Sequence, residues 1–250
     1  MPDLSFSALL IVLLSPAIGS FLTVLIDRLP RGQSIVWPGS ACRACGTGLG
    51  PRDLVPVLSF ALHRGRCRHC TTQIPPWHLY VEITAIGAAV IMVALGGSAL
   101  DMALGVVTLW LLLVLAVTDL LWFRLPDPLT GALALCALTL AATEARLIPA
   151  LWAAAIGSGA FWAIRAGYAA WRGREGLGMG DVKLMAGLGA LVGPWDLPLL
   201  VLLASGVALG TAMARIAATR QPLRADHPLP FGAALSAAGA VMWLMAQIVN

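Results

Sequence analysis

Residues 99–123 read ALDMALGVVTLWLLLVLAVTDLLWF, a long apolar run that carries a carboxylate, Asp119, near its carboxyl end. About 20 apolar residues cross a bilayer as a helix. An acidic residue in such a helix costs roughly 2.5–3.5 kcal/mol on insertion scales, so it normally faces a cavity and has a function there. A second aspartate, Asp181, lies in GLGMGDVKL at 176–184, again within apolar sequence. The leading hypothesis is an acid/base pair, and the alternative is a structural polar pair between two helices.

The composition excludes an ordinary soluble domain. Of the 250 residues, 59% are hydrophobic and only 11% are charged, whereas soluble domains are about 25% charged. We therefore predict an all-α polytopic membrane protein with about eight transmembrane helices. The apolar stretches lie near residues 5–27, 78–97, 99–123, 129–145, 147–170, 182–194, 197–219 and 230–249.

The polar segment 28–77 divides the chain into three expected parts. These are a first transmembrane helix at 1–27, a small cytoplasmic domain at 28–77, and a membrane-embedded domain at 78–250. The first helix lacks a basic amino-terminal region and its apolar run is long, so we do not expect it to be a cleaved signal peptide.

The basic residues predict the orientation, because Lys and Arg concentrate in cytoplasmic loops. With the amino terminus outside, all Lys and Arg residues except Arg146 fall on the cytoplasmic side. Both aspartates and the polar segment then lie at the cytoplasmic face. The net charge of +4 is therefore explained by the basic cytoplasmic loops, and we expect no nucleic-acid partner.

The polar segment contains two C-x2-C pairs, Cys42/Cys45 and Cys67/Cys70, with 21 residues between them. This spacing is typical of a structural zinc site of four thiolates, which would supply folding energy to a segment without a large core. Thiol redox chemistry is the alternative. We favour zinc, and we do not expect disulfides in the cytoplasm. The fifth cysteine, Cys136, lies in a predicted span and is assigned to packing.

Two carboxylates that share a poorly hydrated site hold a single proton between them, as in aspartic proteases. The ionised partner then activates a water while the protonated one polarises the scissile carbonyl. Glycines at Gly178 and Gly180 allow close approach of a substrate to Asp181. Lys183, two residues further on, is interpreted as tuning Asp181 or marking the membrane edge.

Three other acids are candidates for supporting roles. Asp127 is read as a first-turn acid or cap of the helix that follows Pro126. Asp27 is read as an interfacial charge paired with Arg28 or Arg31. Glu82 lies a few residues into an apolar run, where a carboxylate is costly, so interfacial charge and a functional role stay open for it.

Several motifs, taken in order, resemble one family, the type IV prepilin peptidases, which are membrane aspartic proteases of the GxGD kind. The matching segments are GSFL at 19–22, RLP at 28–30, VPVLS at 55–59, RGRCR at 64–68, TD at 118–119 with LPD at 125–127, GMGDVKL at 178–184 and LPFG at 229–232.

The resemblance implies that Asp119 and Asp181 are the catalytic pair. It implies substrates that are prepilins or secretion pseudopilins, cut after a glycine at the cytoplasmic face of the bacterial inner membrane. It also implies methylation of the new amino terminus with S-adenosylmethionine as donor, an activity linked to the cytoplasmic loop.

Two alternatives stay open. The chain departs from the family pattern around the cytoplasmic segment, at Thr23, Asp27 and residues 77–79, so a peptidase without methyltransferase activity is one of them. The other is a non-catalytic assembly protein whose zinc loop docks partners of a pilus or secretion machine.

Overall fold

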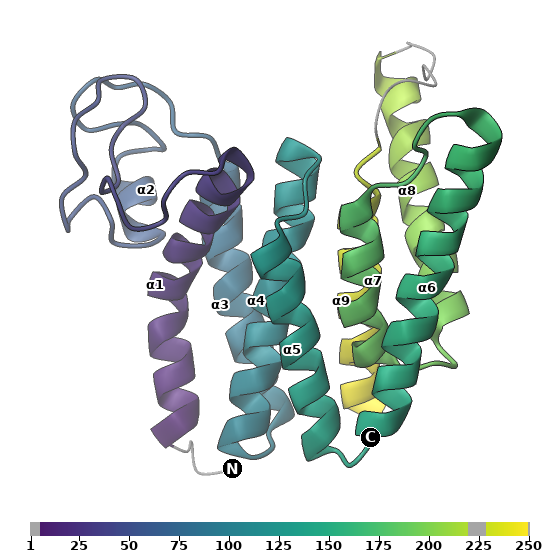
Figure 1. Ribbon diagram of the computed structural model, residues 1–250. Helices are drawn as coiled ribbons and strands as arrows, with labels where there is room; N and C mark the ends of the chain where they lie inside the picture. Colours follow the sequence, from purple (N-terminus) through teal and green to yellow (C-terminus); the bar gives the residue numbers. More distant parts are fainter. Residues whose placement is uncertain (1–5, 220–228, 250) are drawn as a thin grey trace. The chain divides into compact units, whose positions relative to one another are not determined.

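The computed structural model describes residues 6–219 and 229–249, and within these ranges its regular structure is helical apart from two isolated β-bridges. Eight long helices occur at the predicted positions (Figure 1). They are α1 (Phe6–Arg28), α3 (Trp77–Leu95), α4 (Ala99–Trp122), α5 (Asp127–Thr143), α6 (Leu147–Arg172), α7 (Met179–Val192), α8 (Leu197–Thr219) and α9 (Phe231–Val249). Two short helices, η1 (Leu29–Arg31) and α2 (Leu58–Leu62), lie in the polar segment.

Six of the long helices among the described residues are long and apolar enough to cross a membrane. The prediction of an all-α, multi-pass membrane protein is therefore confirmed. The other two, α5 with 17 residues and α7 with 14, are shorter than a typical membrane span.

The chain forms two compact units, residues 1–110 and 111–250. In the first unit α1 packs on α3 at a close approach, since a Cβ on Gly19 would lie 3.1 Å from Cβ of Ala85. The indole Nε1 of Trp110 donates a hydrogen bond to the Ala85 carbonyl at 3.0 Å. This contact fixes the first half of α4 against α3.

The predicted division of the chain into residues 1–27, 28–77 and 78–250 stays a prediction.

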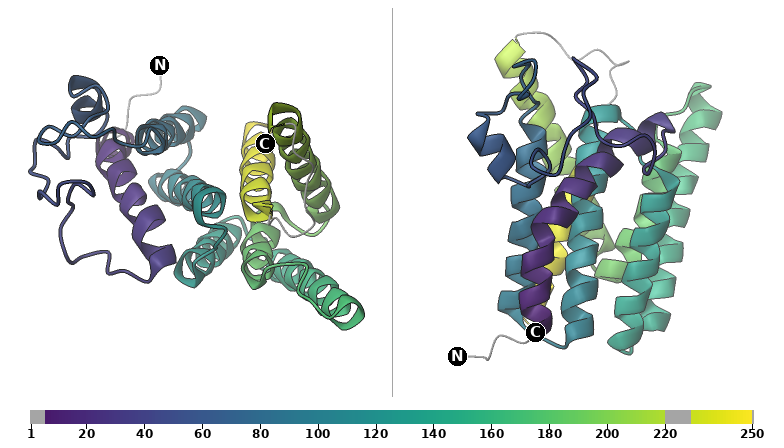
Figure 2. Two further views of the ribbon diagram at one scale, coloured as in Figure 1. Left: turned by 90° about the horizontal axis from the view of Figure 1, so that it is seen from above. Right: turned by 90° about the vertical axis from the view of Figure 1, so that its left-hand side faces the viewer.

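In the second unit α7 packs against α5, α6 and α9, and α9 also packs against α8 (Figure 2). Glycines make these contacts close, because a residue without a side chain lets two helix backbones approach. A Cβ on Gly189 would lie 2.5 Å from the Ala153 carbonyl oxygen of α6, and one on Gly187 would lie 3.0 Å from Leu133 of α5. The short α7 is thus buried among its neighbours.

The ends of α6 and α7 determine where Asp181 lies. Gly173 ends α6 in the left-handed conformation, with φ 68°, and its N–H donates to the Ala169 carbonyl. The chain then returns through residues 174–178, and α7 begins after an extended Gly178. Asp181 is therefore in the first turn of α7.

Candidate functional site

The two predicted aspartates converge on one point of the second unit. Asp119 lies near the end of α4 and is 6% exposed. A Cβ built on Gly232 of α9 would lie 3.1 Å from Oδ2 of Asp119 and 3.0 Å from Oδ1 of Asp181. Because Gly232 has no side chain, both carboxylates face the same small space beside its Cα.

Each carboxylate also lies against backbone at the start of a helix. The N–H of Ala233, in the first turn of α9, donates to Oδ2 of Asp119 at 2.8 Å. Gly178, which caps α7, lies beside Asp181, since a Cβ built on it would be 3.4 Å from Oδ2, and its N–H favours the charged carboxylate. The first N–H groups of a helix have no partner within the helix and favour negative charge. Two helix starts therefore hold the pair.

The role of Gly232 and Ala233 was missed in the sequence, where they appeared only as the end of a family motif and the start of an apolar span. The sequence did contain a signal. Pro230 favours the start of a helix, and Gly232 follows it two residues later with no charged residue beside it. Leu125 was missed as well. It packs under both glycines, 2.9 Å from a Cβ built on Gly180 and 2.7 Å from one built on Gly232.

The predicted supporting residues divide into two groups. Gly178 and Gly180 are in the site, where Gly180 makes its close approach to Leu125 rather than to open space. The ammonium of Lys183 lies 2.7 Å from Oδ1 of Asp127, which is a first-turn acid of α5 as expected. This ion pair links α5, the helix after Asp119, to α7, the helix that carries Asp181.

Glu82 belongs to the first unit, where it is 9% exposed. Its Oε2 accepts a hydrogen bond of 2.7 Å from the N–H of Val57. Val57 has φ 61°, a conformation that is strained for a β-branched residue. Glu82 thus holds a strained turn of the polar segment 28–77, while Asp27 pairs with Arg31 and Arg43.

The four predicted metal ligands come together. One ligand atom from each of Cys42, Cys45, Cys67 and Cys70 lies within 4.8 Å of the others, and the Sγ atoms of Cys42 and Cys70 are 3.7 Å apart. Backbone N–H groups of Cys70 and His69 lower the pKa of the Cys67 thiol. Thiolates are the form that binds metal, so the donor set fits a tetrahedral zinc ion.

The two cysteine pairs form a local repeat that we did not recognise in the sequence. In each, the N–H of the first cysteine donates at 2.9 Å to a threonine carbonyl five residues later, Thr47 or Thr72. Each turn is closed by an isolated bridge, Ala41 to Gly48 and Arg66 to Gln73. The offset is 25 residues in both cases. Each turn presents two thiolates in the same way, as a structural site requires.

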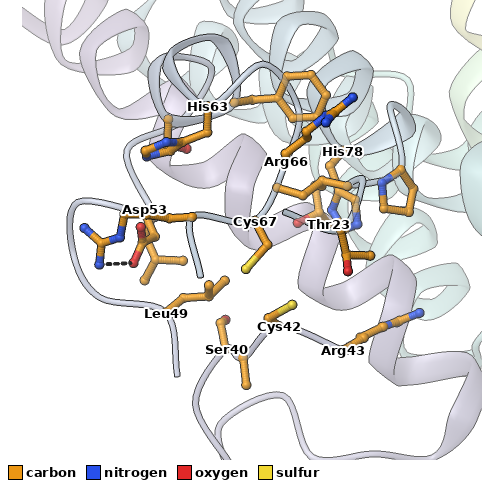
Figure 3. A pocket seen from close by; sticks show the side chains of 18 of the residues that line it. Thr23, Ser40, Cys42, Arg43, Leu49, Asp53, His63, Arg66, Cys67 and His78 are labelled. Carbon is orange, nitrogen blue, oxygen red and sulfur yellow. Dashed lines mark hydrogen bonds and ion pairs between the residues drawn. The ribbon is translucent and has the colours of Figure 1, made fainter. Parts of the chain in front are cut away.

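A cavity of about 520 Å³ lies in the first unit, between the ends of α1 and α3 and the cysteine turns (Figure 3). Asp27, Asp53 and Glu82 are among the residues that line it, together with Phe60 and His78. In Figure 3 Cys42 and Cys67 lie between Ser40 and His78. The cavity is large enough for a small organic ligand.

Comparison with known proteins covers most of the chain. The bacterial peptidase A24 N-terminal domain matches residues 13–95, and the type IV leader peptidase family matches residues 106–214. No solved structure matches.

Three curated relatives share the name prepilin leader peptidase/N-methyltransferase. The protein of Burkholderia pseudomallei strain 1026b is 36% identical over 92% of this chain and 82% of its own length. That of Klebsiella pneumoniae is 36% identical over 77% of this chain and 88% of its own. That of Pseudomonas aeruginosa is 32% identical over 93% and 89%.

Proposed function

The chain belongs to the type IV leader peptidase family, and we propose that it cleaves the leader from prepilins with Asp119 and Asp181 as its catalytic pair. The observation that carries the assignment is the convergence of both carboxylates on Gly232. A structural polar pair between helices needs only a mutual hydrogen bond. Here each carboxylate lies against its own helix start instead, Asp119 at Ala233 and Asp181 at Gly178, which leaves further acceptor positions for a water and a substrate.

The pair would act as an acid and a base. Two carboxylates this close share one proton, because both cannot be ionised in a poorly hydrated site. The ionised group takes a proton from water as the water oxygen attacks the scissile carbonyl carbon, and the protonated group donates to the carbonyl oxygen. The C–N bond then breaks as the carboxyl group that took the proton of the water gives it to the leaving nitrogen, and the other carboxylate takes a proton back from the hydroxyl formed at the carbonyl carbon. Ala233 and Gly178 keep both carboxylates oriented throughout.

We assign methylation of the new amino terminus to the same chain, supported by the names of the relatives. The cavity of the first unit, about 520 Å³, would hold the donor, S-adenosylmethionine. Aromatic rings of Phe60 and His78 suit its adenine and its cationic sulfur, while Asp27 and Glu82 can accept from its ribose hydroxyls. S-adenosylmethionine would supply the methyl group, and the side chains of the cavity would bind and orient this donor.

We propose that zinc has a structural role at Cys42, Cys45, Cys67 and Cys70.

We also propose that the protein lies in the bacterial inner membrane with its amino terminus outside. The charge distribution supports this orientation. Both the zinc segment and the catalytic pair then face the cytoplasm. Substrates would be pilus prepilins or secretion pseudopilins, which the lipid bilayer presents at that face.

Cleavage by the purified full-length protein tests the function. The chain in detergent is mixed with a prepilin peptide that has a basic leader, a glycine at the cut and an apolar stretch after it. Mass spectrometry should show a cut after the glycine, and added S-adenosylmethionine should then increase the mass of the product by one methylene. A cut without the mass gain would identify a peptidase that lacks methylation. A folded protein that does not cut would favour the docking role.

Zinc removal is expected to destabilise the cytoplasmic segment. Metal analysis should give about one zinc per chain, and Cys67→Ser should lose it together with thermal stability, because structural zinc supplies folding energy. The control is Cys136→Ala, which changes a buried cysteine of α5 outside the cluster and should retain zinc. Full folding and activity of a metal-free preparation would contradict the assignment.

A further inference from the structure

One peptide group connects α6 to the catalytic carboxylate on α7. The carbonyl oxygen of Leu177 accepts a hydrogen bond of 3.1 Å from Nε of Arg165. The amide N–H of the same peptide belongs to Gly178, which lies beside the Asp181 carboxylate. A Cβ built on Gly178 would be 3.4 Å from Oδ2 of Asp181, and the N–H favours the charged form of that carboxylate. The guanidinium, the peptide group and the carboxylate therefore follow one another in a continuous polar row.

The loop that carries this peptide group lies on one face of α6. Arg165 and Tyr168 are three residues apart, so their side chains project from the same side of the helix. A Cβ on Gly176 would lie 2.5 Å from the Tyr168 ring, so the backbone of the loop lies directly on that ring. Arg165 also pairs with Glu175 of the loop. Its side chain is only 20% exposed, which makes it an inner contact of the loop.

We infer that Arg165 is a positioning residue for the proposed peptidase reaction, and that it orients Asp181 through the Leu177–Gly178 peptide group. This inference rests on the proposed function. Rotation of a peptide plane moves its C=O and its N–H together, because the peptide bond is planar. A guanidinium bound to the carbonyl therefore fixes the direction in which the N–H of Gly178 points.

Two physical effects follow from this geometry. The first is orientation, since the N–H of Gly178 is a backbone dipole beside the Asp181 carboxylate and a glycine cap has no side chain to add another polar group there. The second is polarisation, because a cation at the carbonyl oxygen strengthens the N–H at the other end of the same amide. Both effects hold the Asp181 carboxylate in the position that the proposed reaction requires.

A purely structural role for Arg165 is the competing explanation. In that case the arginine holds the loop on α6, and its loss lowers stability or loosens substrate binding. Positioning of Asp181 instead affects the chemical step. A displacement of about 1 Å at a reacting group can cost about 100-fold in rate, while binding of the peptide elsewhere on the protein is preserved.

The experiment compares five full-length proteins in detergent by peptide cleavage kinetics and thermal unfolding: wild type, Arg165→Met, Arg165→Lys, Glu175→Gln and Asp181→Asn. Arg165→Met removes the donor, and we expect kcat to fall about 10- to 100-fold with KM within about twofold of wild type. Arg165→Lys retains a charged donor of similar reach, and it should recover most of the lost kcat. Glu175→Gln is the matched control, because it removes only an exposed ion pair of the same arginine and should leave kcat unchanged.

Several outcomes would overturn the inference. They are a kcat for Arg165→Met within about twofold of wild type, a loss confined to KM or to thermal stability, and a lysine variant no better than the methionine one. Cleavage by wild type and none by Asp181→Asn establish the underlying function in the same assay. A wild-type protein that does not cleave therefore rejects the proposed function itself, and a wild-type protein that cleaves while Arg165→Met does so equally well rejects only this inference.

Discussion

Asp119→Asn and Asp181→Asn are each expected to abolish leader cleavage, with kcat falling at least about 10⁴-fold. An amide has nearly the shape of a carboxylate, but it can neither take the proton of the attacking water nor donate one to the carbonyl as an acid does. Residues that act as a unit are non-additive, so the double variant should lose no more than either single one. Mass spectrometry of the peptide products over several hours measures rates this low.

Asp101→Asn is the matched control for the two variants. Asp101 is an aspartate of the same helix as Asp119, and its carboxylate accepts from the Ser98 hydroxyl at 2.6 Å in the first turn of α4. Its loss removes a helix cap and should leave kcat within about twofold of wild type. Cleavage by either catalytic-site variant above about 1% of the wild-type rate would contradict the pair and favour a structural polar contact.

The membrane helices were predictable because hydrophobicity alone determines them. A helix in a bilayer needs about 20 apolar residues, and the long spans show this in any window of the sequence. The short α7 was located by its apolar residues, but what surrounds it was not predictable. Its 14 residues are buried by α5, α6 and α9, and such packing depends on glycines that meet partners far away in the chain.

The two aspartates stood out in the sequence because a carboxylate in apolar sequence is costly. The groups that hold them did not. The N–H of Ala233 and the carbonyl of Leu177 are backbone atoms, and every residue has such atoms, so no residue type marks them in advance. Arg165 was likewise counted only as a cytoplasmic positive charge, since nothing in its neighbours shows that it reaches a loop 12 residues later.

The cysteine spacing predicted the metal site because zinc requires thiolates in close pairs. The repeat of the two turns escaped notice because residues 40–50 and 65–75 share only Cys, Arg, Cys and Thr at equivalent positions. Their likeness lies in backbone hydrogen bonds. Different residues, Gly46 and Thr71, take the same positive φ at equivalent points, so the fold is repeated with little repetition of sequence.

Gly232→Ala is expected to reduce kcat about 100-fold or more while the protein stays folded. The added methyl would lie 3.0 Å and 3.1 Å from an oxygen of each catalytic carboxylate, which is closer than a carbon and an oxygen normally pack. It would also fill the space that both carboxylates face, where the attacking water has to lie. The end of the Leu125 side chain, 2.7 Å from the same methyl, would have to move. Relief at the carboxylates requires a shift of Asp119, Asp181 or the start of α9, and a shift of about 1 Å in a reacting group costs about this much.

Gly131→Ala separates the effect of the methyl in the site from that of a glycine replacement in a helix. Gly131 is on α5 with nothing within 4 Å of a built Cβ, and alanine favours helix over glycine by about 1 kcal/mol, so this variant should cleave normally and unfold no earlier than wild type. Comparison of kcat and thermal unfolding for the two variants decides the matter. If Gly232→Ala cleaves within about threefold of wild type, the space between the carboxylates is not where the reaction takes place, and the catalytic role of the pair fails with it.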